Sequence, residues 1–252
     1  MTNRGAPMAK TAVTSLRVIE ALDDHGQAGV TTLATDLDLA KGTVHKHLTT
    51  LEHCGYVVKD GRTYRLGLGF LGIGGNTQRR LDVYRVGRDA VERLSKATET
   101  AASLMVLEHG RGRYVQRVPF GDEYDLPHHA GDAVPLHATA GGKAILAYLP
   151  TEQRDEILDE RGLPAMTEHT TTERHQLVAE LRSVHDNRIA YDRAELLSGT
   201  YCVAAPVTNE QGHAVAAISV SDHTSLGETR TQDVPGLVIS TATAVENKLR
   251  SP

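Results

Sequence analysis

A short hairpin behind three helical segments constrains this chain more than any other feature. Residues 56–59 and 62–65 flank Asp60-Gly61, a dipeptide that is typical of a two-residue hairpin turn. The apolar periodicity before it predicts three helices, over residues 14–22, 32–37 and 41–54. Three helices followed by a basic hairpin are the elements of a winged helix-turn-helix, which we predict for residues 14–69.

The ends of these helices carry signals of their own. Leu16, Ile19 and Leu22 recur one helical turn apart with Val18 beside them, a periodicity that predicts the first helix. Thr31 is expected as the N-cap of the second helix. Gly55 is expected to close the third helix in a left-handed conformation.

The third helix separates apolar from polar side chains. Its buried stripe is predicted to be Val44, Leu48 and Leu51. Its opposite face carries Gly42, His45, Lys46 and Thr49. That face is short-chained and cationic, which suits a helix in the major groove of DNA. For an isolated helix a solvated surface would be the better interpretation, but the two preceding helices and the hairpin favour DNA.

The candidate DNA contacts fall into three groups. Contacts with phosphates are expected from four basic side chains: Lys41, Lys59, Arg62 and Arg65. Base selectivity is expected from His45, Lys46 and Thr49. The candidate interface is completed by Thr31, Thr32, Gly42 and Thr43.

The charge of the chain is divided between its two parts. Residues 1–80 contain ten Lys and Arg against seven Asp and Glu, a net charge of +3. The remaining 172 residues contain 17 against 25, or −8, which gives the total of −5. A basic segment joined to an acidic remainder favours a DNA reader coupled to a domain that does not touch DNA.

The remainder predicts a mixed α+β domain with one antiparallel sheet. Helices are expected within residues 82–98, 136–149, 151–160, 172–187 and 235–249. Strands are expected over residues 102–108, 113–118, 202–208 and 213–221. We therefore divide the chain into a flexible tail (1–13), a DNA-binding domain (14–69), a linker (70–81) and a second domain (82–252).

The sequence argues against several classes of protein. It contains no GxSxG, HExxH or phosphate-binding glycine loop, so we expect no catalytic residues and no cofactor. His128 and His129 adjoin in what we expect to be a surface loop, without further ligands for a metal. Cys54 and Cys202 are too far apart for a CxxC pair. No segment is apolar enough for a membrane span or a secretory signal, so we expect a cytoplasmic protein.

Four segments in order resemble the isocitrate lyase regulator (IclR) family of transcription factors. Two of them, residues 41–57 and 64–67, are similar to the family's helix-turn-helix and to the end of its wing. Two more, residues 136–144 and 202–207, are similar to signature segments of its effector domain. The resemblance runs from about Thr14 to Lys248, nearly the whole chain.

The resemblance implies a GAF-like effector-binding domain and a homodimer, or dimer of dimers, on a palindromic operator in double-stranded DNA. The implied effector is a small organic molecule such as a carboxylic or sugar acid. The implied pocket residues are Ala140, Gly141, Asp192, Cys202, Ser219 and Ser221. Ser219 and Ser221 alternate onto one strand face, and the start of a helix near Ala140 offers free N–H groups to a carboxylate. Beside an anion, Asp192 would be protonated, fix a water or bind a hydroxyl.

Two other functions remain open at this point. The second domain could serve only oligomerisation, without a small ligand. The chain could instead be an enzyme with Cys202 as nucleophile, although no local pattern ties a histidine or an acid to that cysteine.

Overall fold

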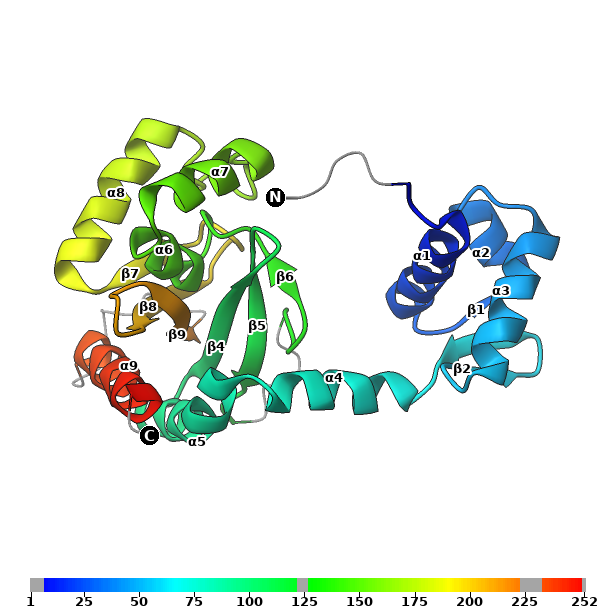
Figure 1. Ribbon diagram of the computed structural model, residues 1–252, viewed down its shortest axis with the longest axis horizontal. Helices are drawn as coiled ribbons and strands as arrows, with labels where there is room; N and C mark the ends of the chain where they lie inside the picture. The colour runs from blue at the N-terminus through cyan, green and yellow to red at the C-terminus, as the bar shows by residue number, and fades with distance from the viewer. Residues whose placement is uncertain (1–6, 122–126, 223–232, 251–252) are drawn as a thin grey trace. The chain divides into compact units, whose positions relative to one another are not determined.

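The computed structural model describes residues 7–121, 127–222 and 233–250, and the chain divides into two compact units, residues 1–77 and 78–252. The N-terminal unit holds helices α1 (Lys10–His25), α2 (Val30–Asp36) and α3 (Lys41–His53). Strands β1 (Ala28–Gly29), β2 (Val57–Asp60) and β3 (Thr63–Leu66) form an antiparallel sheet in the order β1-β3-β2. The predicted hairpin is β2 and β3, and the unit is a helix-turn-helix with a wing (Figure 1).

The core of this unit joins the three helices to the wing. Val18 and Leu22 of α1, together with Val44 and Leu48 of α3, are completely buried. Leu16 belongs to the predicted helical repeat, but its exposed fraction is 58%. Leu16 lies about 120° around the helix from Leu22, so it points away from the stripe that Val18 and Leu22 form.

The structure moves two of the predicted helix starts. α1 begins at Lys10, so residues 10–13 of the predicted tail are helical, whereas residues 1–6 lie outside the described part of the chain. The N-cap of α2 is Gly29 instead of Thr31. Gly29 pairs with Thr63 in the sheet, so the chain leaves an extended strand directly into the helix and Thr31 falls in its first turn. Gly55 has the predicted left-handed conformation, with φ of 80°.

The glycine-rich segment after the wing is a helix, which the sequence did not predict. α4 spans Gly69–Arg79, and every residue in it is at least partly exposed. Leu68, Leu71 and Ile73 are 81%, 72% and 52% exposed.

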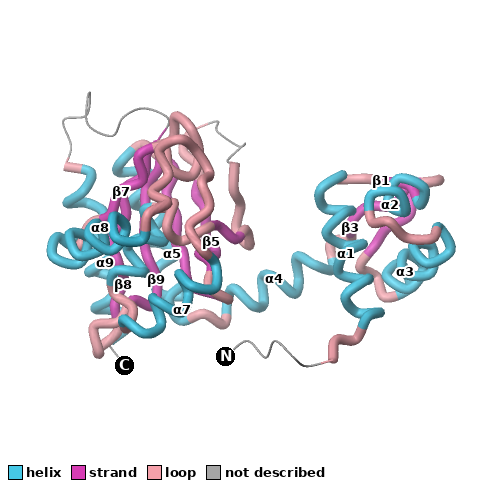
Figure 2. Tube along the Cα trace, turned by 90° about the horizontal axis from the view of Figure 1, so that it is seen from above, coloured by secondary structure: helices cyan, strands magenta, loops and turns pink. Residues whose placement is uncertain are grey.

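The C-terminal unit has three layers, of which the middle one is a six-stranded antiparallel sheet in the order β6-β5-β4-β9-β8-β7. The strands are β4 (Ala101–Glu108), β5 (Arg111–Val118), β6 (Ala133–Val134), β7 (Ala190–Arg193), β8 (Tyr201–Thr208) and β9 (Ala214–Asp222). They run side by side in Figure 2. The short strands β6 and β7 were not predicted, and both lie at the edges of the sheet.

Helices cover both faces of this sheet. α5 (Asp82–Thr98) and α9 (Val234–Arg250) pack on one face through a core that includes Leu94, Leu104 and Val238. α6 (Ala140–Ala147), α7 (Thr151–Arg161) and α8 (Arg174–Asn187) pack on the other, around Met105 and Leu177. Among the described residues, no helix combines the length and the apolar character that crossing a membrane requires.

Candidate functional site

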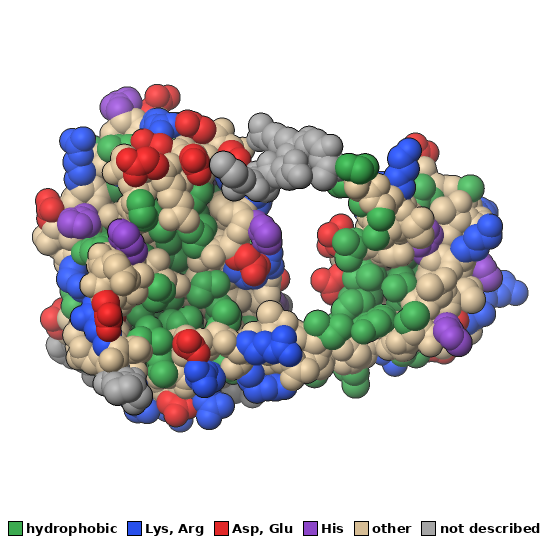
Figure 3. Space-filling view, in the orientation of Figure 1, with side chains coloured by type: hydrophobic (Ala, Val, Ile, Leu, Met, Phe, Trp, Pro, Cys, Tyr) green, Lys and Arg blue, Asp and Glu red, His purple; other side chains and the backbone are tan. Residues whose placement is uncertain are grey.

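The exposed face of α3 carries the residues predicted to read bases. His45, Lys46 and Thr49 are exposed, whereas Val44, Leu48 and Leu51 on the opposite side are buried. Lys41 and Gly42 are also exposed, and Thr43 is half-buried. Thr31 and Thr32 are exposed in the first turn of α2. Lys, Arg and His side chains gather on the side of this unit that carries α3 (Figure 3).

Contacts with α1 hold α3 in place. The ring Nδ1 of His47 lies 2.8 Å from the hydroxyl of Ser15. Arg17 of α1 also donates to the carbonyl of Leu37, at 2.9 Å, in the turn before α3. These contacts hold α3 and the turn before it against α1, while the face with His45, Lys46 and Thr49 stays exposed.

The wing presents basic side chains from a short rigid hairpin. Gly61 has φ of 59°, as its turn requires. Lys59, Arg62 and Arg65 are exposed, while Tyr64 is buried beneath them with the Lys59 ammonium 5.7 Å from its ring centre. A strand alternates its faces, so Tyr64 anchors the wing from its buried side while Arg65, the next residue, points outward and can meet a polyanion.

A second candidate site lies between the sheet of the C-terminal unit and the start of α6. One pocket is lined by all six residues that the family resemblance implied: Ala140, Gly141, Asp192, Cys202, Ser219 and Ser221. The structure adds eight residues that sequence reasoning missed: Tyr114, Arg117, Pro127, His128, Thr139, Leu196, Leu197 and Thr200. The free volume between these side chains is about 20 Å³, enough for about one water molecule.

The floor of the pocket is polar because neighbouring strands align short side chains. Ser221 pairs with Cys202, which in turn pairs with Asp192 across β9, β8 and β7. Ser219, two residues before Ser221, shares its face. Its hydroxyl lies 2.7 Å from the hydroxyl of Ser103, which is buried on β4.

The start of α6 forms another wall. Thr139 is its N-cap, and its hydroxyl accepts a hydrogen bond from the N–H of Gly142 at 3.0 Å. The N–H groups of Ala140 and Gly141, at the first two helical positions, have no acceptor within the helix. They are therefore available to a ligand at the pocket.

Burial changes the protonation of two pocket residues. Desolvation raises the pKa of Asp192 to about 6, against the hydrogen bond that its carboxylate accepts from the N–H of Glu195 at 2.7 Å. Desolvation also raises the pKa of the Cys202 thiol, and the Asp192 charge adds to that effect. A thiol held protonated is a poor nucleophile, which weighs against Cys202 as a catalytic residue.

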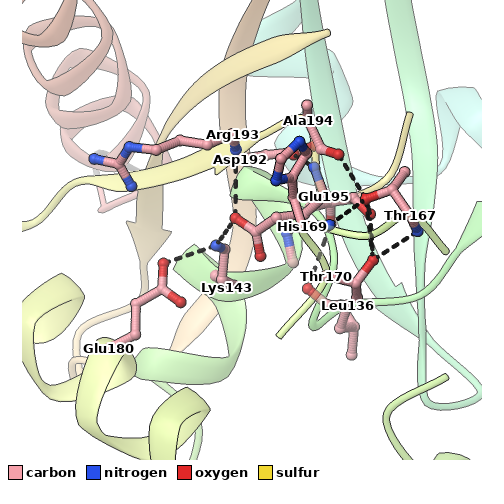
Figure 4. A network of polar contacts seen from close by, with 12 residues as sticks. Leu136, Lys143, Thr167, His169, Thr170, Glu180, Asp192, Arg193, Ala194 and Glu195 are labelled. Atoms are coloured by element: carbon pink, nitrogen blue, oxygen red, sulfur yellow. Dashed lines mark hydrogen bonds and ion pairs between the residues drawn. The ribbon is translucent and has the colours of Figure 1, made fainter. Parts of the chain in front are cut away.

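A buried ion network supports the segment that carries Asp192 (Figure 4). The Lys143 ammonium is fully buried and donates to Glu195 at 2.6 Å and to Glu180 at 2.7 Å. The hydroxyl of Thr170 donates to the Glu195 carbonyl at 2.7 Å. The sequence contained a signal that could have revealed this network, since Lys143 is the one charged residue in the otherwise apolar helix 140–147.

His128 differs in part from its prediction. It does lie in a loop, but it is half-buried against the pocket and stacks on Tyr114, with 6.0 Å between ring centres. Desolvation lowers the pKa of His128, and the charge of Arg117 lowers it further. Within the described residues, no three His, Cys, Asp or Glu side chains gather into a metal-binding group.

Comparison with known proteins identifies the architecture. The model of the IclR helix-turn-helix domain matches residues 12–61, and that of the bacterial transcriptional regulator IclR C-terminal domain matches residues 76–247. The chain belongs to the IclR family of bacterial transcriptional regulators.

Similar proteins cover nearly the whole of this IclR-family regulator. It is 30% identical to the "Probable HTH-type transcriptional regulator ArcR" of Halobacterium salinarum over 99% of this chain and 97% of that one. It is 26% identical to the HTH-type transcriptional regulator KdgR of Escherichia coli, over 92% and 89%. An IclR-type regulator of Alicyclobacillus acidocaldarius superposes with a TM-score of 0.81 at 25% identity, covering 96% of this chain and 98% of that one.

Proposed function

We propose that this IclR-family regulator controls a catabolic operon by binding a palindromic operator and a small organic acid. In this assignment residues 14–69 read DNA, residues 70–81 connect, and residues 82–252 bind the effector. The observation that carries the proposal is the convergence of six residues, distant in sequence, on one polar pocket at the start of α6. The protein would act in the cytoplasm, where bacterial operators lie.

DNA recognition is assigned to the exposed face of α3, with the wing on the flanking phosphates. Lys46 and His45 can donate to base acceptors in the major groove, and the methyl group of Thr49 can contact thymine. Lys59, Arg62 and Arg65 would neutralise phosphates and release counterions, so that affinity falls as salt rises.

Two substitutions separate these roles. We expect Lys46→Ala to lower operator affinity roughly 5- to 100-fold and to relax sequence preference. Arg62→Ala should instead weaken binding to operator and to unrelated DNA alike and reduce the salt slope by about 1. Fluorescence anisotropy on both duplexes at several salt concentrations measures both effects. Equal losses on both duplexes for Lys46→Ala would contradict the assignment of α3.

The pocket chemistry supports an organic acid as effector. Free N–H groups at the start of α6 and two serine hydroxyls offer donors to a carboxylate. A solved regulator of the same fold, from Microbacterium hydrocarbonoxydans, was crystallised with 4-hydroxybenzoate. The same fold can therefore hold a small hydroxylated acid.

The small free volume favours a second candidate function. A space of about 20 Å³ holds no organic acid, so binding requires the lining side chains to move. If they do not move, the C-terminal unit serves only to assemble the protein. A thermal-shift screen of organic and sugar acids separates the two functions. The effector assignment fails if no acid stabilises the protein, or if Ser219→Ala binds a stabilising acid unchanged.

Effector and operator would be coupled by linkage. The effector changes the affinity for the operator only if the two ligands favour different arrangements of the two DNA-binding units. Operator affinity measured with and without a bound acid should therefore change by the same factor as acid affinity measured with and without operator. An operator affinity that stays the same when the acid is bound would contradict the coupling.

A further inference from the structure

The side chains around the pocket divide by charge. β5 contributes Tyr114 and Arg117 at one end, and β7 contributes Asp192 at the other. Strands β4, β9 and β8 lie between them in the sheet. Since neighbouring strands are about 4.8 Å apart, the cation and the carboxyl group start from well-separated positions. A bound molecule therefore meets a cationic end and an acidic end.

A β-bulge in β5 creates the cationic end. Residues three apart on a regular strand point to opposite faces. Here the register shifts between Leu104 and Met105, so that Arg117 pairs with Ser103 and Tyr114 pairs with Met105. Ser103 and Met105 are two residues apart and share a face, so Tyr114 and Arg117 share it too. Bulges commonly re-aim side chains in this way next to binding sites.

Arg117 has unused hydrogen-bonding capacity. Its guanidinium packs 4.6 Å from the ring centre of Tyr114, and its Nε is buried without a hydrogen-bond partner among the described residues. Arg113 on the same strand has Glu108 2.6 Å from its Nε and donates to the carbonyl of Gly131, so its charge is already compensated within the fold. A buried donor without an acceptor costs free energy, which a ligand oxygen would recover.

His128 flanks Arg117 at this end. Its Nε2 is also buried without a partner among the described residues, and its ring stacks on Tyr114. Desolvation and the positive charge of Arg117 both hold the pKa of His128 down. A bound anion would counter the second effect, so that a protonated His128 could donate to it as well.

The Asp192 end suits a hydroxyl group instead. Its carboxyl group is 2% exposed and lies beside Cys202 and Thr200 in the pocket lining. The charge of Glu195 already disfavours a negative charge on Asp192. A ligand carboxylate placed there would meet further repulsion, whereas a ligand hydroxyl could donate to Asp192.

We propose that Arg117 selects the charge of the effector, a hydroxylated organic acid whose carboxylate faces Arg117 and whose hydroxyl faces Asp192. This inference rests on the proposed effector function of the pocket and assigns the class and the orientation of the molecule bound there. In this role Arg117 is a specificity-determining residue, and the bulge in β5 is what places it.

Calorimetry on the full chain tests the orientation. The probes are 4-hydroxybenzoate and D-gluconate, each compared with its carboxamide and with an analogue without hydroxyl groups, benzoate and hexanoate. We expect the wild type to prefer carboxylate over carboxamide by roughly 10- to 100-fold, as a charged hydrogen bond implies. Arg117→Met should reduce that preference to less than about 3-fold, and the matched control Arg113→Met should leave it unchanged. Asp192→Ala should remove the preference for the hydroxylated acid while retaining the preference for carboxylate.

Several results would overturn the inference while leaving the effector function intact. One is an acid that binds Arg117→Met as it binds wild type; another is loss of carboxylate preference in Asp192→Ala. Arg117→Gln and Arg117→Lys are measured alongside, so that the role of Arg117 can still be tested if Arg117→Met does not fold. The Lys variant should keep a reduced preference, and an unchanged preference in the Gln variant would refute the role of Arg117. If neither acid binds wild type at millimolar concentration, the effector function and this inference fail together.

Discussion

Asp192 makes the stability of the C-terminal unit depend on pH. Burial raises its pKa to about 6, above the ordinary value of 3.8, so the folded protein holds this proton more tightly than the unfolded chain. Stability should fall as pH rises through the interval between these two values, and the cost remains in full above it. The difference between the two pKa values corresponds to a loss of at most about 3 kcal/mol in the free energy of unfolding. The charge of Glu195 increases the cost, whereas the charge of Lys143 and the hydrogen bonds from the backbone of Glu195 and Leu196 offset part of it.

Asp192→Asn therefore has a pH-dependent effect. The amide oxygen can still accept the N–H of Glu195, but no charge is buried. We expect this variant to be more stable than wild type by about 1–3 kcal/mol at pH 7.5 and nearly equal to it at pH 4. Thermal unfolding across this range measures the difference, with the exposed Asp186→Asn as control. A constant difference at every pH would contradict the buried charge.

Among the charged residues of this unit, Lys143 is expected to be the one whose substitution lowers stability most. Lys143→Met leaves the carboxylates of Glu195 and Glu180 without their cation, and the loss of one partner from a buried ion pair costs about 3–5 kcal/mol. Lys248→Met, at an exposed position of α9, should change stability by less than about 0.5 kcal/mol. Chemical denaturation measures both variants. Adding Glu195→Gln to Lys143→Met should recover part of the lost stability. No recovery would mean that the loss comes from altered packing and not from the unpaired carboxylate.

At the scale of elements, two helices use glycine in opposite ways. A Cβ at Gly142, near the start of α6, would overlap the backbone carbonyl oxygen and Cα of Leu136. A Cβ at Gly72 in α4 would meet open space. The first glycine is required by a close approach of backbones, and the second is not.

Alanine at these two positions should have opposite effects. Gly142→Ala forces the backbone before α6 to move, and we expect a loss of at least about 2 kcal/mol with disruption of the pocket. Gly72→Ala improves the helix propensity of α4 and should gain about 0.5–1 kcal/mol. Urea unfolding measures both. A neutral Gly142→Ala would show that the start of α6 can shift, which would also weaken the case for its N–H groups as a fixed wall.

At the scale of the whole molecule, we propose that exposed apolar side chains in the N-terminal unit form a contact between copies of the protein. Leu16, Leu68, Leu71 and Ile73 are all more than half exposed, and hydrophobic side chains gather on this unit in Figure 3. Exposed apolar patches of this kind commonly mark protein interfaces. A single recognition helix offers few base contacts, so two copies at a fixed spacing would supply the specificity that a palindrome requires.

Disrupting this surface should reduce assembly without unfolding the chain. We expect Leu71→Glu with Ile73→Glu to increase the dissociated fraction and lower operator affinity at least 10-fold, because each half-site alone binds weakly. Sedimentation measures assembly, and circular dichroism verifies the fold. Val215→Glu, at an exposed position of the C-terminal unit, serves as control. Unchanged assembly and operator binding would place the interface elsewhere.

The sequence by itself determined the local elements and their periodicity. The hairpin at Asp60-Gly61, the buried stripe of α3 and the alternation of Ser219 and Ser221 all follow from spacing and turn chemistry, which act within a few residues. The same local patterns did not determine which residues of a helical repeat are buried, or whether the glycine-rich segment is helical, because both depend on packing against other parts of the chain. Leu16 fits a helical repeat but points away from the core, and the glycine-rich segment after the wing is helical against its propensity.

Only the tertiary structure decided what surrounds the pocket. Arg117 and Tyr114 face it because a bulge changes the register of β5 against β4, and local periodicity does not determine where a bulge falls. Lys143 meets Glu180 and Glu195 from segments 37 and 52 residues away. The raised pKa of Asp192 likewise comes from burial by the folded chain. Spacing along the chain specifies a face of a helix or strand, whereas charge, burial and partners depend on which faces the fold brings together.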